Sequence, residues 1–171
     1  VVTWYSQNQD GSGYGIYGQR YAADGTASGS EFRVNTYTSG SQSQPSVTAL
    51  DGGGFVVTWS SYNQDGDGRG IYGQRYAADG TALGSEFRVN TYTSNNQEYP
   101  SVAALDGGGY VVTWMSNDQD GSNYGIYGQR YAADGTASGS EFRVNTYTSN
   151  SQHDPSVAGL SGGGFVVTWS S

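Results

Sequence analysis

Apolar and polar residues alternate in short runs along this chain, and no long stretch has the spacing of an amphipathic helix. In the run FVVTW, the side chains of Phe55, Val57 and Trp59 would fall on one face of an extended strand. Those of Val56 and Thr58 would fall on the other. Because β-branched and aromatic residues favour strands, the pattern predicts a β-strand with apolar groups on both faces.

The same run returns at a fixed interval. Its tryptophans, Trp4, Trp59, Trp114 and Trp169, are spaced 55 residues apart. A period of this length is typical of one supersecondary unit copied along the chain. We therefore divide the sequence into three repeats and the start of a further one, at residues 1–55, 56–110, 111–165 and 166–171.

Each repeat predicts four short strands joined by turns. The first two are exemplified by residues 101–105 and 110–116, and the third and fourth by residues 71–76 and 86–92 of the preceding copy. The words GGG and ADGT between strands are turn signals, because Gly adopts positive φ freely and Asp-Gly favours tight hairpins. The expected fold is all-β, built from four-stranded antiparallel meanders that resemble β-propeller blades.

The number of repeats leaves the architecture open. Three units are fewer than the ~4–8 blades of a closed propeller, so we expect part of a propeller or an open blade array. A β-trefoil, which also has three four-stranded units, is the alternative.

The repeats differ from one another mainly at residues 5–14 and 40–48 and at the equivalent positions of the later copies. In an up-and-down meander these segments lie at one end of the strands, and the invariant turns lie at the other. Since loops on a rigid scaffold often carry function, we expect a ligand at the variable end. Drift in unconstrained loops is the alternative explanation. The candidate ligand-binding residues are Tyr14, Tyr62, Arg69, Tyr99 and Tyr124.

Charge narrows the range of partners. The chain has 15 acidic residues against 7 basic ones, a formal net charge of −8, and no cysteine. Nucleic acids and anionic membranes attract basic surfaces, so we expect neither as a partner. No apolar run approaches the ~18 residues of a membrane helix, so no membrane insertion is expected. The absence of cysteine excludes disulfides and thiolate chemistry.

The acidic residues suggest a metal. Asp65 and Asp67 in the segment NQDGDG match the first half of the calcium-loop pattern D-x-[DN]-x-[DN]-G. The pattern's twelfth position holds Gln instead of the bidentate Glu of a full loop. Calcium is therefore a possible cofactor, and an ordinary Asp/Gly turn is the alternative. The candidate ligands are Asp10, Asp65, Asp67, Asp118 and Asp120.

The whole repeat, PSVAALDGGG[FY]VVTW followed by GIYGQRYAADGTA and GSEFRVNTYT, resembles tandem repeats of large secreted bacterial proteins of the adhesin or RTX-like type. The words DGGGFVVTW and RYAADGT are also similar to β-propeller blades. This resemblance implies an extracellular or cell-surface location, tandem arrays and calcium.

Catalytic residues do not form a recognisable set. His153 is the only histidine and occurs in one repeat. We therefore expect no enzyme, but a structural or adhesive module of a secreted protein, extended into an array or filament. Its partners would be neighbouring repeats or identical chains joined through edge strands. The alternative is a multivalent, lectin-like propeller that binds glycans through its exposed tyrosines.

Overall fold

The computed structural model describes all 171 residues and contains only antiparallel strands, turns and loops. Four sheets follow one another along the chain, in the orders β1-β2-β3, β4-β5-β6-β7, β8-β9-β10-β11 and β12-β13. The strand bounds are β1 Val2–Gln7, β2 Tyr14–Tyr21, β3 Ala27–Arg33, β4 Gln42–Ala49, β5 Phe55–Tyr62, β6 Arg69–Tyr76, β7 Ala82–Arg88, β8 Gln97–Ala104, β9 Tyr110–Asn117, β10 Tyr124–Tyr131, β11 Phe142–Arg143, β12 His153–Gly159 and β13 Phe165–Ser170. The expected all-β, propeller-like fold is confirmed, and no helix long and apolar enough to cross a bilayer is present.

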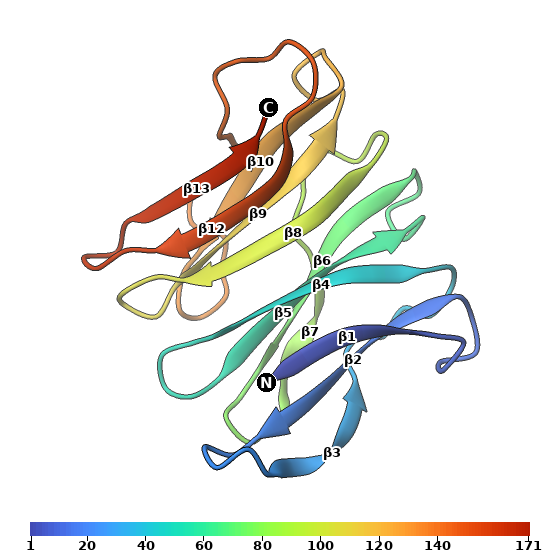
Figure 1. Cartoon of the computed structure of the whole chain (residues 1–171), viewed down its shortest axis with the longest axis vertical. Helices are drawn as coiled ribbons and strands as arrows, with labels where there is room; N and C mark the ends of the chain where they lie inside the picture. Colours follow the sequence, from blue (N-terminus) through green and yellow to red (C-terminus); the bar gives the residue numbers. More distant parts are fainter.

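The sheets are arranged as the blades of a fan (Figure 1). In the second and third blades the first strand is the innermost, and β4 packs beside β8, which in turn packs beside β12. The first blade lacks this inner strand, so that β1 lies next to β4. The fourth blade consists of an inner strand and its partner alone. β1 and β13 are consequently at opposite ends of the fan.

The hydrophobic core lies between blades, as the two-faced strand pattern predicts. On β5, Phe55, Val57 and Trp59 pack in a cluster with Ile16 and Val34 of the first blade. Val56 points the other way, into a cluster that contains side chains of the third blade. Each central blade is therefore buried on both faces, and its stability depends on its neighbours.

The strand bounds differ from those expected, most of all in the outer and inner strands. The outer strand begins at Ala82 instead of Glu86 and ends at Arg88 instead of Tyr92, because Val89 turns inward and its N–H bonds to the Ile71 carbonyl at 2.7 Å. The inner strand begins at Gln97 instead of Ser101, because it continues through Pro100 across a β-bulge. This bulge shapes the site described below.

A buried polar network fixes the linker between blades. The side-chain oxygen of Asn90 accepts the Ile71 N–H at 2.7 Å, and its amide nitrogen donates to the Tyr92 carbonyl at 2.7 Å and to Gln97 Oε1 at 3.1 Å. The same three bonds recur at Asn35 and Asn145. Since Gln97 opens the next blade, each Asn joins two consecutive blades at the variable end.

Further contacts join the blades at their outer parts. The Arg75 guanidinium donates to the Ala133 carbonyl at 2.6 Å and to the carbonyl of Asp134, both in the Asp-Gly turn of the next blade. Glu141 accepts the backbone N–H of Thr91 at 2.6 Å and its hydroxyl at 2.9 Å. These hydrogen bonds, which join consecutive blades, are thus made by invariant segments of the repeat.

Candidate functional site

Three inner strands begin with the same distortion. In β4, β8 and β12 the register shifts just before a proline, and the residue in front of that proline has positive φ. These residues are Gln44 (φ 57°), Tyr99 (φ 56°) and Asp154 (φ 53°). Positive φ is uncommon for residues other than Gly, and a bulge redirects a side chain at the end of a strand. Equivalent backbone positions therefore present three different side chains.

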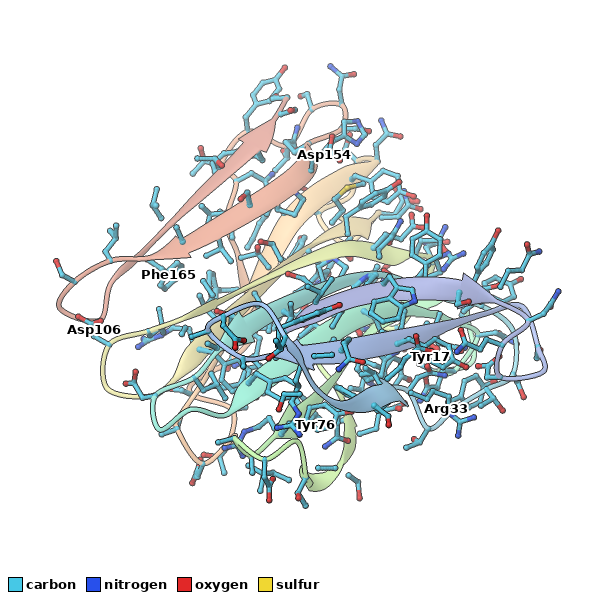
Figure 2. The ribbon with its side chains drawn as sticks, turned by 60° about the horizontal axis from the view of Figure 1, so that its bottom comes forward. Tyr17, Arg33, Tyr76, Asp106, Asp154 and Phe165 are labelled. Atoms are coloured by element: carbon cyan, nitrogen blue, oxygen red, sulfur yellow. The ribbon has the colours of Figure 1, made fainter.

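These side chains converge on one hollow. Gln44, Tyr99 and Asp154, with the prolines that follow them, line a depression of about 350 Å³ at the ends of the inner strands. We call it the axial mouth, because it is shared by three consecutive blades. Figure 2 shows Asp154 at the opposite end of the strands from Asp106, which lies in an invariant GGG turn. The axial mouth is thus on the variable face that the sequence singled out.

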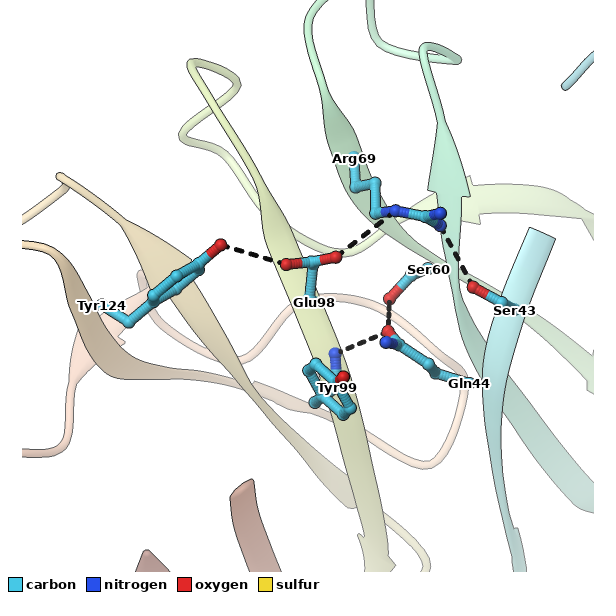
Figure 3. Close-up of polar contacts among 7 residues, drawn as sticks. All are labelled: Ser43, Gln44, Ser60, Arg69, Glu98, Tyr99 and Tyr124. Carbon is cyan, nitrogen blue, oxygen red and sulfur yellow. Dashed lines mark hydrogen bonds and ion pairs between the residues drawn. The ribbon is translucent and has the colours of Figure 1, made fainter. Parts of the chain in front are cut away.

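A polar network supports the axial mouth from the side (Figure 3). Glu98 lies between two blades: its carboxylate pairs with the Arg69 guanidinium at 3.3 Å and accepts the Tyr124 hydroxyl at 3.1 Å. Burial and the Glu98 charge raise the pKa of Tyr124, so this hydroxyl keeps its proton and donates it in the hydrogen bond to Glu98. Arg69 also donates to the Ser43 hydroxyl at 3.1 Å.

Gln44 is held by a second set of bonds. Its side-chain oxygen accepts the Ser60 hydroxyl at 2.7 Å and the backbone N–H of Tyr99 at 3.0 Å. The Gln44 side chain therefore reaches from one inner strand to the next. This contact fixes the backbone that carries the exposed Tyr99 ring, which is 45% exposed.

The predicted ligand-binding residues have different positions. Arg69 and Tyr124 belong to the Glu98 network, and Tyr99 lines the axial mouth. The Arg69 guanidinium carbon lies over the Tyr62 ring, 5.8 Å from the ring centre. Tyr14 packs edge-to-face against Tyr5, with ring centres 5.3 Å apart, in the first blade. Of the five predicted residues, only Tyr99 lines the axial mouth.

Several residues of the site were not among the predicted ones: Gln44, Glu98, His153 and Asp154. Each occupies one of two adjacent positions that differ in all three repeats, so the variation itself was the signal that could have found them. The ring of His153 lies 6.0 Å from that of Tyr124. Sequence reasoning favoured aromatic residues and missed the amide and carboxylate groups beside them.

The predicted calcium ligands make contacts within their own loops or with the linker that follows the outer strand. Asp10 and Asp120 each accept the backbone N–H two residues later, at 3.2 and 3.3 Å. Asp67 accepts the Asn95 N–H at 3.1 Å, and Asp65 approaches the Asn90 amide at 3.5 Å. Asp118 adopts positive φ of 61° at the loop's start. No group of three or more His, Cys, Asp or Glu side chains is placed to hold a metal, and calcium binding stays a prediction.

Larger hollows lie at the opposite end of the strands. One of about 540 Å³ lies between the second and third blades, and one of about 390 Å³ lies at the equivalent place after the third. Both are lined largely by the invariant Gly and Ala turns and by Arg75 or Arg130. Because they repeat the same mainly backbone surface, we place the candidate site at the smaller axial mouth, where side chains of different chemistry meet.

The fold has counterparts among solved structures. An endo-arabinase from Bacteroides thetaiotaomicron VPI-5482 aligns over 91% of this chain and 65% of its own, with a TM-score of 0.51 and 16% identity. An α-L-arabinofuranosidase from Lactobacillus brevis aligns over 91% of this chain and 61% of its own, with a TM-score of 0.53 and 12% identity. The chain thus spans about three fifths to two thirds of their lengths. No family model and no curated protein matches the chain.

These similarities correct two expectations. We expected a structural or adhesive module, extended into an array or filament, and no enzyme. The two solved structures named above are instead an endo-arabinase and an α-L-arabinofuranosidase, which act on carbohydrate. At this level of identity the likeness establishes the fold alone, but it removes the basis for both expectations. The alternative, a carbohydrate-binding propeller-like protein, agrees better with the finding.

Proposed function

We propose that this chain binds carbohydrate at the axial mouth. The observation that carries the proposal is the convergence of an amide, an aromatic ring and a carboxylate at Gln44, Tyr99 and Asp154. Sugars offer hydroxyl groups, which pair with amides and carboxylates, and apolar C–H faces, which pack on aromatic rings. A concave surface with a few convergent polar groups is the usual form of a small-ligand site.

The supports of the site favour the same proposal. Tyr99 is exposed, yet its backbone is fixed by Gln44 and by the following proline. A side chain that is held in place before binding loses less conformational freedom when the ligand arrives. The fold shared with two arabinose-processing hydrolases makes arabinose-containing oligosaccharides the first ligands to test.

Calorimetric titration with arabino-oligosaccharides tests the proposal. We expect Tyr99→Ala to weaken binding about tenfold or more. The loss of one stacking ring costs on the order of 1 kcal/mol, and the transfer free energy of the ring surface that the ligand would bury adds to it. Tyr147→Ala is the matched control, because Tyr147 is 61% exposed and does not line the axial mouth. Absence of binding to a broad glycan array, or equal effects of the two substitutions, would contradict the proposal.

Two carboxylates favour a second candidate function, glycoside hydrolysis. Asp154 lines the axial mouth, and Glu98 occupies the neighbouring blade at the position just before Tyr99. Most glycosidases use a pair of carboxyl groups, one as acid and one as base or nucleophile. Release of reducing ends from arabino-oligosaccharides measures this activity. Loss of release in both Glu98→Gln and Asp154→Asn, with sugar binding retained, would support it; unchanged release in either would exclude that residue.

A further inference from the structure

The polar side chains of the axial mouth differ in the hydrogen bonds that they can still make. The amide oxygen of Gln44 accepts both the Ser60 hydroxyl, at 2.7 Å, and the Tyr99 N–H, at 3.0 Å (Figure 3). A carbonyl oxygen has two lone pairs, so these two bonds use both of them. Gln44 can therefore offer a ligand the two donors of its amide nitrogen, but not its oxygen.

Asp154 supplies the opposite chemistry. An ionised carboxylate accepts hydrogen bonds and donates none, and its two oxygens together have about four lone-pair sites. Asp154 is exposed and lies among the residues that line the axial mouth. The other lining residues are Gln44, Tyr99 and three prolines, which carry no charge. The lining therefore combines one negative charge with neutral groups.

The arginine beside the axial mouth is already paired. The Arg69 guanidinium lies 3.3 Å from the Glu98 carboxylate and donates to the Ser43 hydroxyl at 3.1 Å. Glu98 therefore balances the charge of Arg69. The Tyr99 ring is 45% exposed, and the face of an aromatic ring attracts cations. Asp154 and Tyr99 thus present two features that both favour a positively charged group.

From this arrangement we propose that the axial mouth prefers carbohydrates with a free amino group to neutral or acidic ones. The inference rests on the proposed function and names a ligand class for the same site. A protonated amine has three donors and no acceptor, so it is complementary to the Asp154 carboxylate. The Tyr99 ring packs on the C–H faces of the sugar and attracts its charge, while the Gln44 donors bind sugar oxygens.

The same arrangement disfavours other sugars. The carboxylate of a uronic acid would face Asp154, and like charges placed together across an interface weaken binding. Acetylation of an amino sugar removes the positive charge and leaves one N–H in place of three donors. The glucosamine tetramer and its fully N-acetylated counterpart have the same sugar backbone. Comparison of their affinities therefore measures the contribution of the free amine.

Calorimetric titration with these two tetramers provides the measurement, at about pH 6, where amines with a pKa near 8 are protonated. We expect the glucosamine tetramer to bind about fivefold or more tightly, because charge-assisted hydrogen bonds are roughly twice as strong as neutral ones. Asp154→Asn should bring the ratio of the two affinities close to one. Asn, like Asp, tolerates the positive φ of this position, so the variant retains the backbone of the site.

A matched control removes the same charge at the other end of the strands. The net charge of −8 attracts any cation to some extent, and Asp51→Asn lowers it by the same amount as Asp154→Asn. Asp51 is exposed and lines the hollow at the invariant end, so its substitution should leave the ratio unchanged.

Three outcomes would overturn the preference: equal affinities for the two tetramers in the unmodified chain, binding of neither, or equal effects of the two substitutions. The titration with arabino-oligosaccharides described above reports separately on the proposed function. Binding of those sugars without a preference for the amine would leave carbohydrate binding in place and remove only the present inference.

Discussion

The buried Asn90 side chain offers the sharpest test of how the blades are joined. Replacement by Ala removes the acceptor of the Ile71 N–H and the donor to the Tyr92 carbonyl and to Gln97. Asn90 is 2% exposed, so water does not readily replace these partners. Each buried polar group left unpaired costs about 1–3 kcal/mol. With three groups affected and partial relaxation, we expect Asn90→Ala to lower the free energy of unfolding by about 3–5 kcal/mol.

Urea unfolding, followed by both circular dichroism and tryptophan fluorescence, measures this loss. Coincident transitions would justify a two-state treatment, which repeat arrays do not always obey. Asn90→Asp is a graded control: it retains an oxygen for the Ile71 N–H but loses the amide donor, so its loss should be substantial. A loss below about 1 kcal/mol for Asn90→Ala, or a fully stable Asn90→Asp, would refute the assignment of this network as the link between blades.

Two further predictions concern backbone contact and pH. Gly109→Ala should lower the free energy of unfolding by about 2 kcal/mol or more, because its Cβ would lie 2.5 Å from the Tyr131 carbonyl oxygen. The equivalent Gly164→Ala should leave the unfolding midpoint unchanged. Thermal unfolding of the two variants at low concentration compares them directly. Burial, with the nearby carboxylates, raises the pKa of Tyr72 and of Tyr127 to about 12. Because these tyrosines ionise near pH 10 in the unfolded chain, the stabilisation is complete below pH 10 and is lost as pH rises through 12. Absorbance at 295 nm and circular dichroism should therefore show late tyrosine ionisation accompanied by unfolding; early ionisation without unfolding would contradict this.

Much of the fold follows from local pattern. The alternation around Phe55 predicted a strand with two apolar faces, and the structure buries those faces against two different blades. The ends of the strands were harder to predict. Val89 has high strand propensity, yet it leaves the sheet because the buried Asn90 directs the linker toward Ile71. The hydrogen bond between Ile71 and Asn90 joins residues 19 positions apart, so the propensities of neighbouring residues do not predict it.

The candidate site was only partly predictable for a related reason. Sequence variation indicated the end of the strands at which the axial mouth lies, but the choice of residues at that end favoured tyrosines. Tyr14 and Tyr62 are occupied with neighbouring side chains, whereas Gln44 and Asp154 are directed into the axial mouth by a bulge. A bulge arises from pairing with the next strand, so its effect on side-chain direction is not apparent from the order of residues alone.

The separation of invariant and variable positions has a consequence for how such a protein can change. Segments common to all copies make several of the contacts that join one blade to the next, such as Arg75 with the following Asp-Gly turn. Contacts at variable positions, such as Arg69 with Glu98 and Gln44 with the Tyr99 N–H, depend on which copy follows. The order of the copies then determines the surface at the axial mouth. Exchanging two units would rearrange Gln44, Tyr99 and Asp154 around the axis without changing the fold of each blade. Duplication and shuffling of whole units would thus vary the axial mouth while keeping the invariant contacts between blades.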